Sequence, residues 1–326
     1  MAKANYTIGI DLGGTKLASG LVDHSGKLLF QARKPTVPPQ SKFTPAQHIK
    51  YVVDMMASTV EEMVMRIPGG KTRADKLKLL HSVGLASAGP MNVLQGKIID
   101  PPNFKGWKTV PIVSLLEKEL AKRGIKKKVH FQNDAIAAAL GEGWVGAAKG
   151  LQTYVMITLG TGIGSGVILN GKPAQSGGMG SEWGHALCDI SALDKIKPGA
   201  KLKTSDMYAS TVEGIASGTG LRARTGREPR DLADLARRGD KNAKEIFAQA
   251  SRAIAGLWFT LSLGFNLERI LITGGLIHIE DVFVPQAIEL YNQLITAQAP
   301  AFKTKIVRAK MDNTAGIIGA ARLGRL

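Results

Sequence analysis

The stretch Ile8-Gly-Ile-Asp-Leu-Gly-Gly-Thr-Lys-Leu-Ala-Ser-Gly-Leu-Val-Asp23 predicts a strand, a tight glycine turn and a second strand. Gly13-Gly14 lets the backbone turn sharply and bring its N–H groups close to a ligand, because glycine has no Cβ. Thr15 and Lys16 add a hydroxyl and a cation, which are groups that hold a phosphate. Asp11, at the end of the first strand, is placed to hold a hydrated divalent cation beside that phosphate. This stretch alone leaves an ordinary Gly-Gly hairpin open as the alternative.

A second stretch, Met156-Ile-Thr-Leu-Gly-Thr-Gly-Ile-Gly-Ser-Gly-Val-Ile-Leu-Asn-Gly-Lys172, repeats the order of apolar strand, glycine-rich turn and returning strand. Internal repeats of this kind set the architecture of a chain. Two related hairpins in the two halves of the sequence predict two similar α/β lobes, each presenting a glycine turn to a central cleft. A nucleotide with several phosphates is the ligand that such a doubled arrangement favours.

Length and composition indicate a globular chain of two domains. The 326 residues exceed what one hydrophobic core usually supports, and the 44% of apolar residues argues against extensive disorder. The single cysteine, Cys188, excludes an intrachain disulfide and fits a reducing compartment. We expect a cytoplasmic protein with no membrane segment, because Met1 leads directly into the first strand. The longest apolar run, near Ile254–Phe265, is interrupted by Ser262 and Gly264, which indicates a buried helix.

The chain is strongly basic, with 43 Lys and Arg residues against 26 Asp and Glu residues and a formal net charge of +17. Such a charge suits a nucleic-acid or polyphosphate partner. The basic residues are spread over segments 71–78, 122–128, 222–238 and 303–310, however, and do not alternate with aromatic residues as on a single-strand-binding surface. A solvated basic surface is the simpler interpretation, so we expect no nucleic-acid partner.

Two segments of the first half are candidates for substrate contacts. Residues 71–78 are predicted to form a loop that leads into the first of these segments. The strand predicted over Leu79–Leu85 then ends in Ala86-Ser-Ala-Gly-Pro90. Ligands of open α/β sheets bind at the carboxyl ends of strands, so Gly89 lies where a ligand is expected. The proline-fixed segment Asp100–Trp107 offers Asn, Phe and Trp side chains to a sugar, or is only a rigid connector.

Residues Val129–Trp144 predict a strand that enters an alanine-rich helix through Asn133 and Asp134. Asn and Asp are favoured helix N-caps, so capping alone would explain one of them. In the functional interpretation, Asp134 is a carboxylate at the carboxyl end of the strand. From there it would accept a hydroxyl proton during phosphoryl transfer.

Three later segments carry further candidates. Gly177-Gly-Met-Gly-Ser-Glu-Trp-Gly-His185 places Glu182 three residues before His185. The pair could be a fragment of a metal site, but with one thiol in the chain a tetrahedral zinc site lacks ligands, so contacts to substrate hydroxyls are favoured. Glu213, near the start of a predicted helix, is a candidate for the same pocket. Arg269-Ile-Leu-Ile-Thr-Gly-Gly-Leu-Ile277 predicts a buried strand that ends in a third glycine turn, suited to the flat face of a base.

Taken together, these segments resemble the ROK (repressor, open reading frame, kinase) family of sugar kinases in the actin-like ATPase superfamily, and within it the bacterial glucokinases. The resemblance covers nearly the whole chain. It rests on Asp11–Lys16, Ala88-Gly-Pro90, Pro102-Asn103, Asn133-Asp134, Leu159-Gly-Thr-Gly-Ile-Gly164, Ser181-Glu-Trp-Gly-His185, Glu213 and Thr273-Gly-Gly275.

The resemblance implies a fold and a reaction. The fold is α/β, with two actin-like (ribonuclease H-like) lobes around a central cleft. Residues 1–133 would form the small N-terminal lobe, completed by a C-terminal helix at 312–326, and residues 134–311 the large lobe. The reaction is ATP- and Mg²⁺-dependent phosphorylation of the 6-hydroxyl of a hexose, with glucose as the first candidate, by a homodimer whose partners are the sugar and ATP.

The resemblance also implies the roles of individual residues. Asp134 is the general base. The sugar contacts are Gly89, Asn103, Asn133, Asp134, Glu182, His185 and Glu213. The nucleotide contacts are Asp11, Gly13, Gly14, Thr15, Lys16, Thr161, Gly162, Gly274 and Gly275, and Asp11 also holds the metal through water or through ATP.

The chain departs from the family in one interval. Most members carry a cysteine-rich zinc motif there, whereas Cys188 is the only cysteine in Ala186–Val212. We therefore expect no zinc site and leave open the direction in which the Glu213 side chain points. Some ROK glucokinases that use polyphosphate resemble this zinc-less state, which keeps polyphosphate open as a donor. N-acetylhexosamines, mannose and fructose remain alternative substrates.

Rival classes fit the sequence less well. A repressor of the family would carry a helix-turn-helix before the Asp11 loop, and we expect none in the ten residues that precede it. A dinucleotide oxidoreductase would need Gly-x-Gly-x-x-Gly opening a helix, whereas the glycines at 160–166 lead into a strand. A noncatalytic, sugar-binding actin-like protein remains as the alternative that would not need Asp134.

Overall fold

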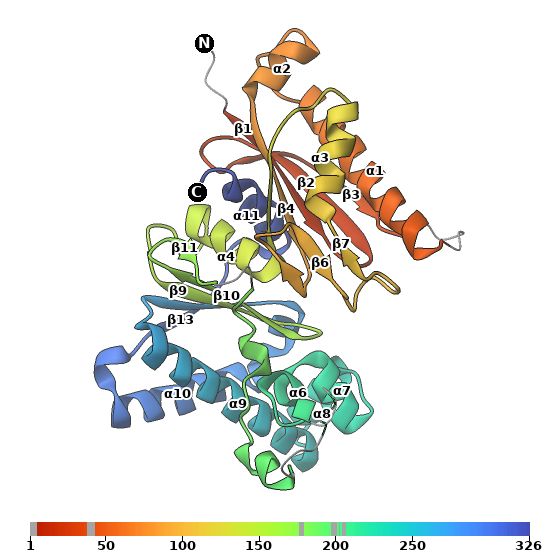
Figure 1. The fold of residues 1–326 in the computed structure, drawn as a ribbon. Helices are drawn as coiled ribbons and strands as arrows, with labels where there is room; N and C mark the ends of the chain where they lie inside the picture. Colours follow the sequence, from red (N-terminus) through yellow and green to blue (C-terminus); the bar gives the residue numbers. More distant parts are fainter. Residues whose placement is uncertain (1–4, 38–42, 176–178, 197–200, 202, 204–206) are drawn as a thin grey trace. The chain divides into compact units, whose positions relative to one another are not determined.

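The computed structural model describes residues 5–37, 43–175, 179–196, 201, 203 and 207–326. The chain divides into two compact units (Figure 1). Unit 1 comprises residues 1–150, 172–180 and 310–326, and unit 2 comprises residues 151–171 and 181–309. The first change of unit thus follows residue 150, whereas the sequence led us to expect it after residue 133.

The central sheet of unit 1 has the strand order β3-β2-β1-β4-β8. Its strands are β1 (Tyr6–Leu12), β2 (Lys16–Val22), β3 (Leu28–Pro35), β4 (Leu80–Ser87) and β8 (Val129–Asn133). The first three strands form an antiparallel meander, and β4 and β8 run parallel to β1. The carboxyl ends of β1, β4 and β8 therefore meet at one edge of the sheet, where the predicted phosphate, sugar and catalytic segments follow them.

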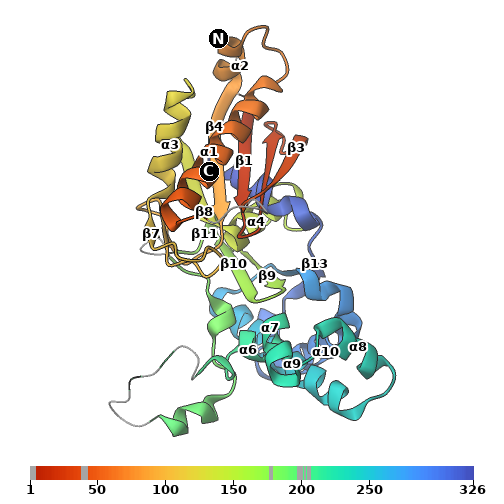
Figure 2. The same ribbon diagram turned by 90° about the vertical axis from the view of Figure 1, so that its right-hand side faces the viewer.

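Helices α1 (Pro45–Met65) and α3 (Ile112–Lys122) pack together on one face of this sheet (Figure 2). Successive residues of a strand face opposite sides, so Ile8 and Ile10 share a face and join Met56 of α1 and Leu116 of α3 in the main hydrophobic core of unit 1. This core fixes the orientation of β1 and hence of the glycine turn that follows it.

Helix α11 (Ala315–Leu323), dark blue in Figure 1, packs against β1 and β4 and crosses α4 (Asp134–Val145). The approach is close enough to involve the backbones. A Cβ on Gly319 would lie 1.6 Å from the carbonyl oxygen of Ala137, and a Cβ on Gly84 would lie 1.8 Å from that of Ala320. Glycine is therefore required at both contacts, and the C-terminal helix is an integral part of unit 1.

A small antiparallel sheet in unit 1 consists of β5 (Met91–Asn92), β6 (Lys97–Ile99) and β7 (Thr109–Val110). The segment 100–107 connects β6 to β7. The loop expected at 71–78 is wrong, because α2 (Arg73–Leu79) occupies most of it. Thr72 and Asp75 form a reciprocal capping box there, which satisfies N–H groups of the first turn and makes a short, lysine-rich helix stable enough to form.

The sheet of unit 2 repeats the topology of unit 1. Strand β10 (Ile163–Leu169) is antiparallel to β9 (Tyr154–Leu159), while β12 (Arg269–Thr273) is parallel to β9 and β13 (Lys305–Arg308) is parallel to β12. The order β10-β9-β12-β13 matches β2-β1-β4-β8. The repeat that the two glycine hairpins predict is therefore present in the strand order. The short β11 (Lys172–Pro173) follows β10 in the chain.

Helices make up most of the rest of unit 2. They are α6 (Val212–Ala216), α7 (Gly218–Thr225), α8 (Pro229–Arg237), α9 (Lys241–Phe265) and α10 (Val284–Gln298), with short 3-10 segments η1 (Trp183–His185), η2 (Ile190–Lys195), η3 (Gly275–Val282) and η4 (Pro300–Phe302). The segment η5 (Asp312–Thr314) belongs to unit 1. Helix α9 packs against α10 and α6, and Trp258 meets Tyr291 edge-on at 6.4 Å between ring centroids.

Among the helices in the described part of the chain, α9 is the one that is long and apolar enough to cross a membrane by length and composition. It extends well beyond the apolar run at 254–265 toward the N-terminus. Of its most apolar window, 56% is buried inside the protein, as in the core helix of a globular unit.

The side chain of Glu142 ties together segments of unit 1 that lie far apart in the sequence. It is fully buried on α4. Its Oε1 accepts the backbone N–H groups of Lys310 and Met311 at 2.9 and 2.7 Å, and its Oε2 accepts that of Ala147 at 2.6 Å. Residues 147 and 310 each lie close to a point where the chain passes from one unit to the other. Glu142 therefore fixes two of these connecting segments to unit 1.

Replacing Glu142 by Ala is expected to lower the free energy of unfolding by about 2 kcal/mol, because three backbone N–H groups lose their acceptor in a buried place. Urea unfolding checks this. Glu289→Ala, at an exposed position of α10, is the control and should change stability by no more than about 0.5 kcal/mol. Equal stability of the two variants would contradict the anchoring role of Glu142.

Candidate active site

The first glycine turn of unit 1 connects β1 to β2. The N–H of Gly13 donates to the carbonyl oxygen of Lys16 at 3.0 Å, which closes the turn. Gly14 lies against the backbone of Asn103, since a Cβ on Gly14 would be 2.6 Å from the carbonyl oxygen of Asn103. Thr15 and Lys16 are exposed. The turn thus presents a hydroxyl and a cation to solvent at the carboxyl end of β1, as the prediction of a phosphate loop requires.

Two carboxyl groups lie at this edge of the sheet. Asp11 is near the end of β1, and Asp134 directly follows β8. Burial raises the pKa of Asp11 to about 6, with a further increase from the charge of Asp134 and a smaller decrease from Lys16. Burial also raises the pKa of Asp134. Gly316 allows the Asp11 side chain to lie close to the backbone of α11, because a Cβ at position 316 would be 2.5 Å from Oδ2 of Asp11.

Asn133 and Asp134 both make bonds at the start of α4. Oδ1 of Asn133 accepts the N–H groups of Ala135 and Ile136 at 2.9 and 3.2 Å, so Asn133 is the N-cap. Its amide nitrogen would be 3.7 Å from a Cβ on Gly89. Asp134 accepts the N–H of Ala135 through Oδ1 at 2.8 Å. The capping interpretation therefore holds for Asn133, and the amide of Asn133 and the carboxyl of Asp134 share the sheet edge with Gly89.

The segment Asp100–Trp107 separates into a buried part and an exposed part. Phe104 and Trp107 are 1% and 2% exposed and stack on each other at 4.4 Å between ring centroids. They anchor the segment in the core of unit 1, so for these two rings the rigid connector, and not the sugar contact, is the alternative that holds. Asn103 is exposed beside Gly14 and remains available for a ligand.

The second glycine turn, in unit 2, connects β9 to β10. The N–H of Gly160 donates to the carbonyl oxygen of Gly162 at 3.0 Å. Helix α7 supports the turn through two backbone hydrogen bonds. The N–H of Gly218 donates to the carbonyl oxygen of Gly160 at 2.8 Å, and the N–H of Thr219 donates to the carbonyl oxygen of Thr161 at 3.0 Å. Thr161 is exposed. The turn is thus closed by its own backbone and supported from behind by a helix N-terminus.

The carboxyl end of β12 lies beside this second turn. Gly274 has φ 105°, and a Cβ on it would be 2.3 Å from the carbonyl oxygen of Leu159. Gly275 is exposed, and a Cβ on it would meet nothing within 4 Å. Its backbone nitrogen lies 3.9 Å from the Cβ position of Gly160. Unit 2 therefore gathers two predicted nucleotide-binding segments at one sheet edge.

Glu213 supports the second turn. Its Oε2 accepts the N–H of Ile163 at 2.7 Å and would be 2.5 Å from a Cβ on Gly162. The sequence suggested contact with a sugar, and the structure shows in addition a hydrogen bond to the second glycine turn. A contact between its second oxygen and a ligand stays a prediction.

Glu182 directly precedes the short segment η1, His185 is the last residue of η1, and both are exposed. η1 packs against β10 and α6, and the N–H of Val212 donates to the carbonyl oxygen of Ala186 at 3.0 Å. This bond brings the ends of the segments that carry His185 and Glu213 side by side in unit 2. The glycines at 177 and 178 lie outside the described residues.

The interval expected to lack zinc is only partly described, since residues 197–200, 202 and 204–206 lie outside the described part. Within that part, no three His, Cys, Asp or Glu residues are grouped so as to hold a metal ion. The absence of a zinc site stays a prediction. The carboxylate of Asp11 fits Mg²⁺, which commonly uses one or two carboxylates together with water and substrate phosphates.

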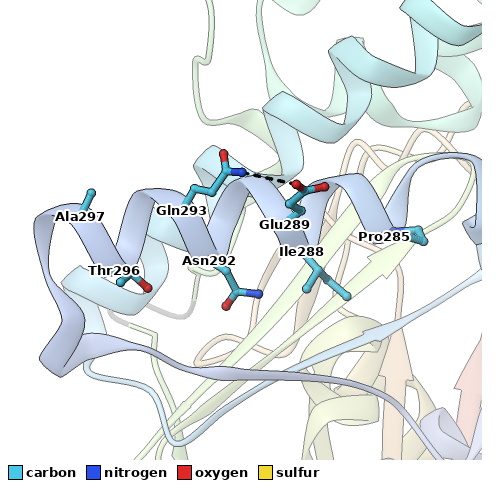
Figure 3. A pocket seen from close by; sticks show the side chains of 7 residues that line it. All are labelled: Pro285, Ile288, Glu289, Asn292, Gln293, Thr296 and Ala297. Carbon is cyan, nitrogen blue, oxygen red and sulfur yellow. Dashed lines mark hydrogen bonds between the residues drawn. The ribbon is translucent and has the colours of Figure 1, made fainter.

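A hollow of about 710 Å³ lies away from these segments, on α10 of unit 2 (Figure 3). Its lining repeats at helical spacing along one face of the helix, where Gln293 donates to Glu289 at 3.4 Å. The lining residues are Pro285, Ile288, Glu289, Asn292, Gln293, Thr296 and Ala297. They include no predicted site residue.

With this geometry in hand, comparison with known proteins identifies the class of protein. A family model described as ROK family matches residues 7–325, so the chain belongs to the ROK family and is a sugar kinase of that family. Its mixed α/β fold is that of the ROK kinases, which have the actin-like ATPase fold.

Individual relatives show the range of named substrates. The chain is 30% identical to a glucokinase from Streptomyces coelicolor, with 98% of this chain and 97% of the relative covered. It is 29% identical to a fructokinase from Zymomonas mobilis, with 96% and 94% covered, and 25% identical to an N-acetylmannosamine kinase from Pasteurella multocida, with 96% and 94% covered.

Solved structures agree over the same length. The ROK hexokinase from Thermus thermophilus has a TM-score of 0.77 at 26% identity, with 98% of this chain and 97% of that chain covered. The inorganic polyphosphate/ATP-glucomannokinase from Arthrobacter sp. strain KM has a TM-score of 0.59 at 26% identity, with 98% of each chain covered.

Proposed function

We propose that this sugar kinase transfers the γ-phosphoryl group of ATP to the 6-hydroxyl of a hexose, with glucose as the preferred acceptor. The observation that carries the proposal is the carboxyl group of Asp134, held at the carboxyl end of β8 beside Asn133 and Gly89. Its pKa is raised by burial, which makes the carboxylate a stronger base than an exposed one. The curated glucokinase relatives support glucose as the acceptor.

In the proposed mechanism, the side chains of unit 1 place the acceptor hydroxyl. Asn103 and the amide of Asn133 bind sugar hydroxyls, and Asp134 accepts the proton of the 6-hydroxyl as its oxygen attacks the γ-phosphorus. Glu182 and His185 of unit 2, and the second oxygen of Glu213, bind further hydroxyls. Positioning and electrostatic stabilisation supply most of the catalysis in such a transfer.

The phosphates are assigned to the two glycine turns and the adenine to Gly274-Gly275. The backbone of Gly13–Thr15 and the side chain of Lys16 bind phosphate oxygens, and Thr161 and Gly162 do so in the second turn. Asp11 is the carboxylate that would hold Mg²⁺, through water or through ATP. When bound, Mg²⁺ would neutralise charge on the phosphate oxygens.

The acceptor is tested by a coupled ADP-release assay with Mg-ATP across glucose, mannose, fructose, N-acetylglucosamine and N-acetylmannosamine. We expect the highest kcat/KM with glucose. A higher value with fructose or an N-acetyl sugar would keep the kinase and overturn the acceptor. Sugar binding without turnover of any of the five would favour a noncatalytic sugar-binding protein and overturn the proposal.

The donor has one specific alternative. The similarity to a polyphosphate/ATP-glucomannokinase, together with the net charge of +17, keeps polyphosphate open as a second donor. Replacing ATP by polyphosphate in a direct assay for sugar phosphate decides between one donor and two.

We further propose a cytoplasmic homodimer, in keeping with the family resemblance.

A further inference from the structure

His48, on the first turn of α1, contacts two segments of the proposed site in unit 1. Its Nδ1 lies 3.2 Å from the indole nitrogen of Trp107, and its Nε2 lies 3.1 Å from the carbonyl oxygen of Thr36. The side chain is half-buried. No role follows for it from the sequence patterns that predicted the site.

The two partners of His48 determine its tautomer. An indole N–H only donates a hydrogen bond, so Nδ1 must be the acceptor. A carbonyl oxygen only accepts, so Nε2 must carry the proton. His48 is therefore neutral with its proton on Nε2, and in this form it bonds both neighbours at once.

Trp107 connects His48 to the sugar segment. Its ring stacks on Phe104, and its backbone N–H donates to the carbonyl oxygen of Phe104 at 3.0 Å. Asn103 directly precedes Phe104. Gly106 lies against α1, because a Cβ on it would be 2.9 Å from Cγ of Pro45. The place of Trp107 against α1 therefore sets the place of Asn103.

Thr36 connects His48 to the phosphate turn. It is fully buried, its N–H donates to the carbonyl oxygen of Thr15 at 3.1 Å, and its hydroxyl donates to that of Gly14 at 2.8 Å. Gly14 in turn lies against the backbone of Asn103. A closed set of contacts thus runs from the phosphate turn through Thr36, His48 and Trp107 to the sugar segment and back.

We propose that His48 is a positioning residue that holds the Asn103 segment in register with the phosphate turn. This inference rests on the proposed function, because it assigns the sugar to one segment and the phosphate to the other. The Nδ1 bond acts on sugar binding, and the Nε2 bond acts on nucleotide binding.

The two bonds can be removed one at a time. In His48→Gln the side-chain amide reaches the Nε2 position and keeps the bond to Thr36 but loses that to Trp107. In His48→Asn the side-chain oxygen occupies the Nδ1 position and keeps the bond to Trp107 but loses that to Thr36. We expect His48→Gln to raise the sugar KM by about three- to tenfold and the ATP KM by less than about twofold. For His48→Asn we expect the ATP KM to rise by about three- to tenfold and the sugar KM by less than about twofold. The loss of one net hydrogen bond changes a binding constant by about three- to tenfold.

Controls separate positioning from general damage. Lys50→Gln, at an exposed position on the same helix, should leave both KM values unchanged. Trp107→Phe removes the same hydrogen bond by deleting its donor, the indole N–H. Its effect on the sugar KM should therefore not add to that of His48→Gln in the double variant. Equal changes in both KM values for the two His48 variants, or additive effects in the double variant, would overturn the proposal.

A readout independent of catalysis tests the same bond. By NMR, the indole N–H of Trp107 should exchange slowly with solvent in the native chain and at least about tenfold faster in His48→Gln, while His48→Asn keeps it protected. Unchanged exchange in His48→Gln would overturn the proposed bond. If the native chain phosphorylated no hexose, the proposed function would fall, and sugar and ATP affinities measured by calorimetry with the same variants would decide the role of His48.

Discussion

Asp134→Asn is expected to reduce kcat by about two to four orders of magnitude, which is the usual effect of losing a general base. The amide keeps the size of the side chain but cannot take the proton of the attacking hydroxyl. Oδ1 can still accept the N–H of Ala135, so α4 should begin as in the native chain. We therefore expect sugar and ATP affinities within about threefold of the native values and an unchanged melting temperature.

The matched control is Asp231→Asn, which makes the same change at an exposed position in the first turn of α8. Its turnover should equal that of the native chain. Steady-state kinetics with ADP release, together with calorimetric affinities for both substrates, separate a loss of chemistry from a loss of binding. Near-normal turnover in Asp134→Asn would remove Asp134 from the role of base.

Gly319→Ala is expected to lower the free energy of unfolding of unit 1 by at least about 3 kcal/mol, because overpacking that displaces backbone is among the costlier core changes. The added Cβ would lie 1.6 Å from the carbonyl oxygen of Ala137, so α11 and α4 must move apart. Asp134 is the first residue of α4, and Gly316 of α11 lies against Asp11. The displacement should therefore reduce activity as well as stability.

Gly256→Ala in the interior of α9 is the control for Gly319→Ala, since its Cβ would meet nothing within 4 Å. There, alanine should stabilise the helix by about 0.5–1 kcal/mol relative to glycine. Urea unfolding followed by circular dichroism and by activity measures both variants. A Gly319→Ala protein as stable as the native chain would contradict the close crossing of α11 and α4.

Features that depend on neighbouring residues could be predicted from the sequence. The turns at Gly13-Gly14 and Gly160–Gly162 are local patterns of strand, glycine and strand, and each lies where such a pattern places it. Because the pattern occurs twice, the repeated strand order followed from it. The cap at Asn133 is also local, since its partners are two and three residues away.

Features that depend on distant partners could not be predicted. Glu142 accepts the N–H of Lys310 across 168 positions, and His48 accepts that of Trp107 across 59. Nothing near either residue in the sequence signals these bonds. For the same reason the sequence could not decide whether Phe104 and Trp107 face a sugar or anchor a connector, since their burial depends on how the segment packs against α1.

The helix at α2 and the role of Glu213 show two further limits. A lysine-rich composition predicted a loop, but the reciprocal bonds of Thr72 and Asp75 favour a helix there. Glu213 was a candidate site residue from its place near the start of a predicted helix and from the family resemblance, yet its bond to Ile163 depends on the turn geometry, which the sequence does not specify.

The central claim, phosphorylation of a hexose at its 6-hydroxyl by ATP, is tested most directly by identifying the product. The chain is incubated with Mg-ATP and glucose, and phosphorus and carbon NMR spectra are recorded as the reaction proceeds. We predict glucose 6-phosphate and ADP in equal amounts, with no release of inorganic phosphate. ADP with inorganic phosphate and no sugar phosphate, or phosphate on a different hydroxyl, would contradict the account.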